Sequence, residues 1–305
     1  MTIYSAPLQG YTGPEWRRLH ASMFGGVDRY CSPFLRVEKG AARPKDVRAI
    51  SVTDVTPDVL PQILFRDIDE FRILTDAVIG AGHTAVDLNL GCPFPPQVKH
   101  GRGAALLRKP ELLGAVAEEM RTRYPQMTFS VKVRLGVSEP DEWRAVMPQL
   151  TGMPLSHIAV HPRVATQQYG GELRLDEFGE FLTSSPHPVI YNGDILSPAD
   201  YGTVTDRFPT LTGIMIGRGL LTRPSLATEI RSGQEWDEAR RLASLLDIND
   251  ALLDIYRDTL CGDAQILSKI KPYWDYAEPI IGHKAAKAIR KATTMTAYSS
   301  AIAKI

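Results

Sequence analysis

The chain has few cysteines and no long hydrophobic run. Its 305 residues include three cysteines, Cys31, Cys92 and Cys261. The cysteines are few, odd in number and far apart in the sequence. They therefore exclude a disulfide framework and a zinc cluster, and they fit a reducing compartment. No apolar segment approaches the length of a membrane span, and the N-terminus lacks the pattern of a signal peptide. We therefore expect a cytoplasmic protein that does not enter a membrane.

The sequence also lacks an excess of either charge. Its 35 lysines and arginines balance 35 aspartates and glutamates. Global basicity of the kind that attracts nucleic acid is absent, so any contact with nucleic acid has to come from a local patch. The seven histidines show no metal-ligand spacing, and we predict no metal site.

Short apolar segments alternate with amphipathic ones along most of the chain. Helical spacing of apolar residues occurs at 71–82, 111–123, 142–150 and 199–208. Alternation of this kind predicts parallel strands joined by helices. Eight repeats within about 220 residues predict an α/β fold, a closed (β/α)8 TIM barrel. The predicted strands are 3–7, 29–37, 60–65, 85–90, 128–134, 157–161, 189–192 and 213–216.

The strand signal stops near residue 233. The remaining chain predicts three helices, at 235–256, 264–276 and 282–303, with glycine and proline between them. We therefore predict a barrel domain over 1–233 and a small C-terminal all-α helical domain over 234–305.

Cys92 follows the predicted strand 85–90, between Gly91 and Pro93. A thiol at the end of a strand lies where a barrel carries its chemistry, and the loop 94–103 that follows is basic and reads as a lid. The alternative is a cysteine that acts only as a small buried hydrophobe. Position favours a functional thiol.

Lys132 and Arg134 alternate with valines in one predicted strand, so both side chains point to the same face. Two inward cations need an anionic ligand or acidic partners, because an unpaired buried charge is costly. An anionic cofactor is the first interpretation, and an internal ion pair with Asp87 or Asp194 is the alternative.

Glycines at the last two predicted strand ends, Gly193, Gly217 and Gly219, permit close backbone approach to an anion. A phosphate site often lies there in this fold, and Arg218 could add a guanidinium. Ordinary turns have the same glycines, so both interpretations stay open from these residues alone.

Seven motifs, in this order, resemble the tRNA-dihydrouridine synthase family, most closely its bacterial C-type branch. Together they cover nearly the whole chain. They are Ala6–Gly10, Val86–Pro93, Gly103–Leu112, Val131–Gly136, Asn192–Ile195, Ile216–Gly219 and Lys269–Trp274.

The resemblance implies an FMN enzyme that reduces a uridine in tRNA to 5,6-dihydrouridine with NADPH. Reduced flavin gives a hydride from N5 to C6 of the uracil, and Cys92 gives a proton to C5. A proton donor must hold its proton beforehand, so Cys92 should be a thiol and not a thiolate.

The resemblance also assigns residues to the cofactor and to the substrate base. Asn89, Arg134 and Arg163 are expected near the base. The expected flavin contacts are Pro7, Leu8, Gln9, Gln62, Lys132, His161, Asn192, Gly193, Asp194, Gly217 and Arg218.

The C-terminal region is locally basic, and Lys284, Lys287 and Lys291 share one helical face. A target base must leave the folded tRNA to reach a flavin in a barrel, and contacts to phosphates offset that cost. The resemblance thus implies that these lysines contact the tRNA substrate. A solvated helix face is the alternative.

Two other functions compete with this hypothesis. A flavin barrel of the dihydroorotate dehydrogenase type needs no basic helical domain. An RNA-binding protein that has lost catalysis does not need Cys92 and Lys132. We expect a monomer, and the sequence does not predict which uridine is modified.

Overall fold

The computed structural model describes residues 1–51 and 57–305. Its contacts divide the chain into two compact units. We call the first the barrel unit: Met1–Pro7, Asp28–Gly193 and Thr205–Met215. The second, the helical unit, is Leu8–Val27, Asp194–Val204 and Ile216–Ile305. The predicted domain boundary after residue 233 stays a prediction.

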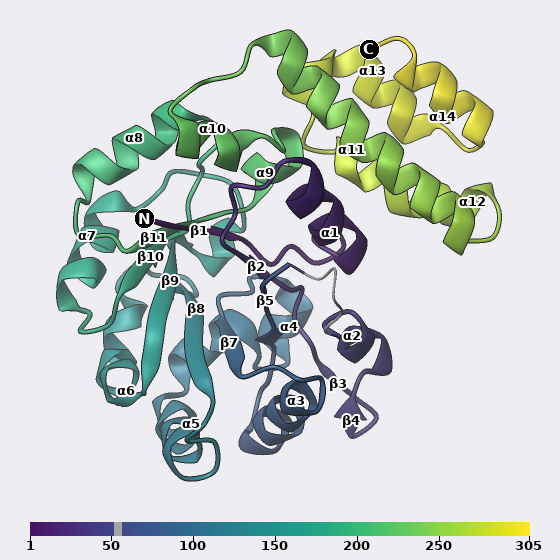
Figure 1. The fold of residues 1–305 in the computed structure, drawn as a ribbon. Helices are drawn as coiled ribbons and strands as arrows, with labels where there is room; N and C mark the ends of the chain where they lie inside the picture. The colour runs from purple at the N-terminus through teal and green to yellow at the C-terminus, as the bar shows by residue number, and fades with distance from the viewer. Residues whose placement is uncertain (52–56) are drawn as a thin grey trace. The chain divides into compact units, whose positions relative to one another are not determined.

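The described residues form one sheet of nine parallel strands, nearly closed into the predicted TIM barrel (Figure 1). Its order is β5-β2-β1-β11-β10-β9-β8-β7-β6. The end strands β5 and β6 are separated only by Pro61, which has no N–H for the ladder and splits the predicted strand 60–65 in two. The strands are β1 (Thr2–Ser5), β2 (Arg29–Cys31), β5 (Val59–Leu60), β6 (Gln62–Ile63), β7 (Ala85–Leu90), β8 (Thr128–Gly136), β9 (Leu155–Val164), β10 (Val189–Tyr191) and β11 (Gly213–Ile216).

Helices of the barrel unit lie outside these strands (Figure 1). The predictions for 71–82, 111–123 and 199–208 are confirmed, whereas 142–150 forms a 3-10 turn at Glu142–Ala145 and a short helix. Asp67 caps α3 by accepting a hydrogen bond from the Glu70 N–H. The helices of the barrel unit are α3 (Ile68–Gly80), α4 (Pro95–Lys99), α5 (Pro110–Thr122), α6 (Met147–Gly152) and α7 (Leu175–Ser184). Most residues of α8 (Pro198–Arg207) belong to the helical unit.

The predicted strand 29–37 is wrong beyond Cys31. Pro33 interrupts it, and residues further on form a separate hairpin of β3 (Val37–Glu38) and β4 (Ala41–Ala42), followed by α2 (Pro44–Arg48). Inside the barrel, small and medium side chains fill one buried layer. Its members are Ala6, Cys31, Leu60, Ala159, Ile190 and Met215.

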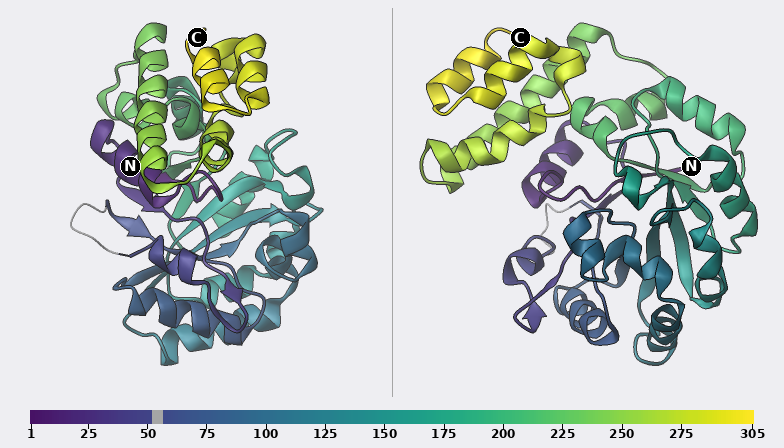
Figure 2. Two further views of the ribbon diagram at one scale, coloured as in Figure 1. Left: turned by 90° about the vertical axis from the view of Figure 1, so that its right-hand side faces the viewer. Right: turned by 180° about the vertical axis from the view of Figure 1, so that it is seen from behind.

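The sequence did not predict α1 (Pro14–Met23), α9 (Arg218–Thr222) or α10 (Leu226–Ser232) of the helical unit. Of these, α1 packs on α11 (Glu238–Thr259). The predicted helix 282–303 is two helices, because the chain leaves helical geometry after Lys291 and Thr294 caps a new one. Figure 2 shows them in yellow. The remaining helices are α12 (Asp263–Ile270), α13 (Glu278–Lys291) and α14 (Met295–Ile302).

Tyrosine and tryptophan hold the helical unit together. The Tyr273 hydroxyl donates to the Tyr11 carbonyl at 2.6 Å, and the Trp274 indole N–H donates to the Tyr298 hydroxyl at 2.8 Å. Both donors belong to the motif Lys269–Trp274, so this motif has a structural role as well as a family resemblance.

A single carboxylate, that of Glu142, fixes the loop after β8 in the barrel unit. It accepts the main-chain N–H groups of Val137, Ser138 and Glu139 at 2.9–3.1 Å and the guanidinium of Arg108 at 2.7 Å. Burial raises the pKa of Glu142, but these donors outweigh burial and lower the pKa to about 2.

Replacing Glu142 by glutamine should destabilise the barrel unit by about 2 kcal/mol at neutral pH, because a charged acceptor of several bonds is lost. A lowered carboxyl pKa gives stability that is complete above pH 4.5 and lost as the pH falls towards about 2. The free energy of unfolding, measured with urea between these pH values, should therefore change less with pH for Glu142→Gln than for the unaltered chain. The control is Glu118→Gln, since Glu118 is 63% exposed. Equal losses for both variants would contradict this role.

Candidate active site

Strand register brings the predicted polar residues together inside the barrel unit. Gln62 on β6 lies beside Asp87 on β7, and Asp87 lies beside Ser130 on β8. One step along the strands, Asn89 lies beside Lys132. Paired residues on neighbouring strands share a face, so these side chains form two rows on the inner face.

Three of these side chains form a continuous hydrogen-bond chain, which we call the amide chain: Asp87, Gln62 and Asn89. Gln62 Nε2 donates to Asp87 Oδ2 at 2.7 Å, and Asn89 Nδ2 donates to Gln62 Oε1 at 2.7 Å. Asn89 Oδ1 in turn accepts the main-chain N–H groups of Gly91 and Cys92 at 3.1 and 2.8 Å. The amide chain therefore ends on the residue predicted to be catalytic.

Cys92 is partly exposed, and its thiol keeps its proton. Burial raises its pKa above the ordinary value, while the Phe94 N–H and the cations Arg134 and Lys132 oppose the rise. At neutral pH the group is thus a thiol. This protonation state suits an acid and not a nucleophile.

The loop after Cys92 folds back onto it. Gly103 has a φ of +60°, and a Cβ there would lie 2.7 Å from both the Cβ and the carbonyl oxygen of Cys92. The Ala104 N–H donates to that carbonyl at 3.1 Å. The predicted basic lid is partly neutralised, because Arg102 pairs with Glu70 at 2.5 Å.

Lys132 lies on the inner face of the barrel unit. Its ammonium makes no hydrogen bond or ion pair with Asp87 or any other described residue of this unit, although the two charges shift each other's pKa. The Asp87 oxygens accept from Gln62 and Ser130 instead. Burial first, and then Arg134, lower the pKa of Lys132 to about 8. Lys132 is therefore mostly charged at neutral pH.

Arg134 holds main chain at the predicted substrate side. It donates to the carbonyls of Gly91 and Val164, each at 3.0 Å. Its guanidinium also lies 5.5 Å from the ring centroid of Tyr169. Arg134 is 1% exposed, so it ties the ends of β7 and β9 together, and contact with a substrate stays a prediction.

His161 and Arg163 lie within β9 and not beyond its end, because the strand continues to Val164. Arg163 Nη1 lies 3.3 Å from His161 Nε2, and Arg163 Nη2 donates to the Gly171 carbonyl at 2.8 Å. Both side chains are buried.

Sequence reasoning missed Tyr169. The residue is 44% exposed, and the centroid of its ring lies 6.4 Å from that of the His161 ring. The residue before it, Gln168, has a φ of +51°, a costly conformation for a residue other than glycine. In the sequence Tyr169 is a single tyrosine followed by two glycines. It belongs to no periodic pattern, so nothing marked it as a candidate site residue.

The predicted cofactor residues divide between the two units. In the barrel unit, Asn192 Nδ2 donates to the Met215 carbonyl at 2.7 Å. In the helical unit, Arg218 pairs with Asp194 at 2.5 Å. The barrel unit carries Pro7, Gln62, Lys132, His161, Asn192 and Gly193, and the helical unit carries Leu8, Gln9, Asp194, Gly217 and Arg218.

Lys284, Lys287 and Lys291 on α13 are exposed and pair with no acidic side chain in the described part of the chain. Ala286 and Ile289 are the buried side of the same helix. The three lysines therefore form one solvent-facing basic stripe, which we call the α13 stripe.

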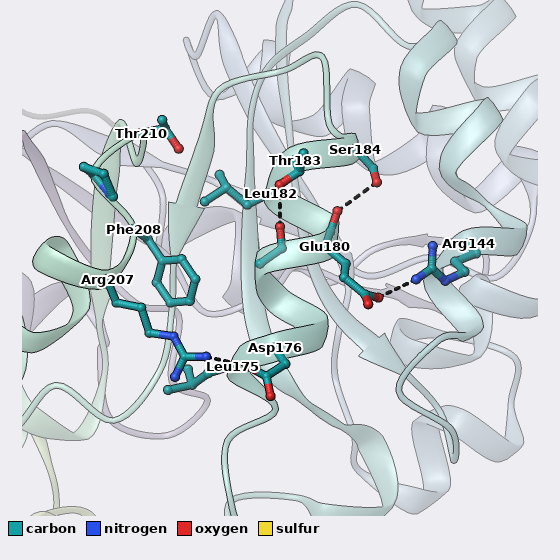
Figure 3. A pocket seen from close by; sticks show the side chains of 12 residues that line it. Arg144, Leu175, Asp176, Glu180, Leu182, Thr183, Ser184, Arg207, Phe208 and Thr210 are labelled. Carbon is teal, nitrogen blue, oxygen red and sulfur yellow. Dashed lines mark hydrogen bonds and ion pairs between the residues drawn. The ribbon is translucent and has the colours of Figure 1, made fainter.

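A groove with a volume of about 710 Å³ lies elsewhere on the barrel unit, against α7 (Figure 3). Ion pairs join Arg144 to Glu180 and Arg207 to Asp176 there. The groove contains none of the predicted site residues. Within residues 1–51 and 57–305, no three His, Cys, Asp or Glu side chains gather as a metal site requires, and no helix has the length and hydropathy of a membrane span.

Comparison with known families decides the assignment. The profile of dihydrouridine synthase (Dus) matches residues 4–291. The chain belongs to the dihydrouridine synthase family. This membership confirms the resemblance of the motifs and makes the chain an oxidoreductase. It favours the dihydrouridine synthase hypothesis over the alternative of a dihydroorotate dehydrogenase.

Curated relatives of this dihydrouridine synthase bear matching names. It is 30% identical to a "tRNA-dihydrouridine(16) synthase" of Neisseria meningitidis over 75% of this chain and 71% of the relative. Identity is 29% to the protein of the same name from Cupriavidus necator, over 77% of each chain. A "tRNA-dihydrouridine(47) synthase [NAD(P)(+)]" of Coprinopsis cinerea is 32% identical over 50% of this chain and 24% of the relative.

Solved structures share the fold of this dihydrouridine synthase. An old yellow enzyme homologue from Zymomonas mobilis has a TM-score of 0.57 at 11% identity, covering 77% of this chain and 89% of that one. Morphinone reductase has a TM-score of 0.52 at 12% identity, covering 77% and 87%. At these identities the likeness shows the fold alone.

Gly103→Ala should displace Cys92. A side chain at positive φ costs about 1–3 kcal/mol, and here it also overlaps Cys92. We expect a loss of stability and an altered alkylation rate of the Cys92 thiol, followed by mass spectrometry of its peptide. Gly40→Ala is the matched control, since Gly40 has a φ of +79° with nothing within 4 Å of an added Cβ. An unchanged Cys92 alkylation rate in Gly103→Ala would refute the contact.

Proposed function

We propose that this chain reduces a uridine of tRNA to 5,6-dihydrouridine, with FMN as its flavin and NADPH as the reductant. The observation that carries the proposal is the inner face of the barrel unit. There a protonated Cys92 is electrostatically coupled to Lys132, a cation with no hydrogen-bond partner in the described residues. An acid and a cation are what the addition of a hydride and a proton to a uracil ring requires.

The residues fit a flavin by their chemistry. Lys132 offers a positive charge that forms no hydrogen bond or ion pair with a described carboxylate of the barrel unit, and the reduced flavin ring is anionic. Asn192 and Gly193 follow β10 and would hold the polar tail. Asp194, Gly217 and Arg218 are proposed as flavin contacts from the resemblance of the motifs alone. When bound, the flavin supplies a hydride to C6 of the uracil.

The chain's own residues supply the proton and bind the base. Cys92 gives its proton to C5, where negative charge grows as the hydride arrives at C6, so the ring gains two hydrogens and loses one double bond. The thiolate that remains is stabilised by Arg134, Lys132 and the Phe94 N–H. In the free protein these groups oppose the rise of the Cys92 pKa that burial causes. Asn89, Arg163 and His161 lie on the same face and would contact the uracil or the flavin.

The names of relatives support the finer points. Two bacterial relatives that match over most of their length are named for position 16, and we propose uridine 16 as the target. The name of the fungal relative, which includes NAD(P)(+), supports a nicotinamide reductant, and we propose NADPH from the motif resemblance. The enzyme would act as a monomer on cytoplasmic tRNA.

The α13 stripe supports a tRNA backbone contact in the helical unit. Exposed lysines without acidic partners can each neutralise a phosphate, and the affinity they provide depends on salt through counterion release. Such contacts would offset the cost of taking the base out of its stack.

Cys92→Ala should retain FMN and lose dihydrouridine formation by about 100- to 10,000-fold, the usual contribution of a general acid. The assay uses purified yellow protein, NADPH and unmodified tRNA, with mapping of the product at position 16. Cys261→Ala is the control, because Cys261 is an exposed cysteine. Full activity of Cys92→Ala would remove Cys92 from the mechanism, and a protein that cannot be loaded with FMN would refute the cofactor.

Lys287→Glu combined with Lys291→Glu should weaken tRNA binding and flatten the dependence of log Kd on log salt, because two phosphate contacts are lost. Filter binding at several salt concentrations measures both quantities. The control for the change of charge is Lys45→Glu, because Lys45 is an exposed lysine on α2 of the barrel unit. If binding by the double variant equals that of the unaltered chain, the stripe is only a solvated face.

A further inference from the structure

Asp87 is a buried acid that the proposed reaction does not use. It lies in the middle of β7 with 0% exposure. Burial raises its pKa to about 6, while hydrogen bonds from Gln62 and Ser130 and the charge of Lys132 oppose the rise. A buried carboxylate costs free energy, and an apolar residue would serve the packing of a barrel better. Its presence points to a role beyond packing.

The contacts of Asp87 give direction to the amide chain. A carboxylate can only accept hydrogen bonds, so Gln62 must turn its NH2 group towards Asp87. Its oxygen then faces Asn89, which must turn its own NH2 group towards Gln62. Without an acceptor at position 87, either amide could rotate by half a turn and exchange donor for acceptor.

The direction of the Asn89 amide determines the main chain at Cys92. With its oxygen on that side, Asn89 accepts the N–H groups of Gly91 and Cys92 and closes a tight turn at the end of β7. With its NH2 group on that side, donors would face donors and the turn would lose both bonds.

We propose that Asp87 is a positioning residue, which holds the Cys92 thiol in place by fixing the direction of hydrogen bonds through Gln62 and Asn89. The proposal rests on the proposed role of Cys92 as the acid. Asp87 contacts neither substrate nor flavin in this scheme. It acts through the two amides and the main chain.

Two replacements of Asp87 separate the acceptor from the charge. Asp87→Ala removes the acceptor and should lower kcat about 100-fold, the effect of misplacing a reacting group by about 1 Å. Flavin content and KM for tRNA should change little. Asp87→Asn should recover most of the loss, because its oxygen can accept from Gln62 while its NH2 group donates to Ser130 Oγ.

Two further variants test whether Asp87 acts through Gln62 and not through Ser130. Ser130→Ala removes the other partner of Asp87 and should change kcat little. Gln62→Met should lower kcat, and adding Asp87→Ala to it should cause no further loss, since both break the same chain. In all variants the alkylation rate of Cys92 in the free protein, followed by mass spectrometry, should change in parallel with kcat.

The proposal fails if Asp87→Ala keeps the kcat and the Cys92 alkylation rate of the unaltered chain. It also fails if Asp87→Asn is as impaired as Asp87→Ala, since the charge would then matter and not the acceptor. If Asp87→Ala does not fold, an unchanged Cys92 alkylation rate in Gln62→Met overturns it. Should the unaltered chain form no dihydrouridine, the proposed function fails, and the alkylation series still decides the role of Asp87.

Discussion

The hydrogen bonds that converge on the buried carboxylate of Asp87 set the polar interior of the barrel unit. From it the amide chain runs through Gln62 and Asn89 to the main-chain N–H of Cys92. Every donor in the chain points towards the carboxylate. Burial makes this arrangement strict, because an amide turned the wrong way would leave unsatisfied groups where water cannot reach them.

Burial also sets the charge states around this chain. It moves the pKa of Cys92 upwards and that of Lys132 down to about 8, each towards the neutral form. Between Asp87, with a pKa of about 6, and Lys132 lies a range near neutral pH in which carboxylate, ammonium and thiol coexist. A protonated thiol beside a cation is the combination that proton donation to a developing anion requires.

Much of this could be predicted from sequence, because strand and helix periodicities are local. The barrel, its strand ends and Cys92 followed from such patterns. Pro61 was visible in the sequence, but its effect on strand pairing was not. Pro14 after Gly13 indicates the start of a helix and would have predicted α1. The contacts of Arg134 and Tyr169 could not be predicted, since main-chain carbonyls and a ring distant in sequence decide them. The amide chain depends on register between strands, which no local pattern reveals.

The protonation state of Cys92 tests the account most directly. The alkylation rate of its peptide in the free protein, measured against pH, reports the fraction of thiolate. We predict that the midpoint of this rate against pH lies above 9.0, the ordinary pKa of a cysteine thiol, because burial raises the pKa of Cys92. A midpoint near or below about pH 7, as in reactive thiolates, would contradict it, because Cys92 would then hold no proton to give.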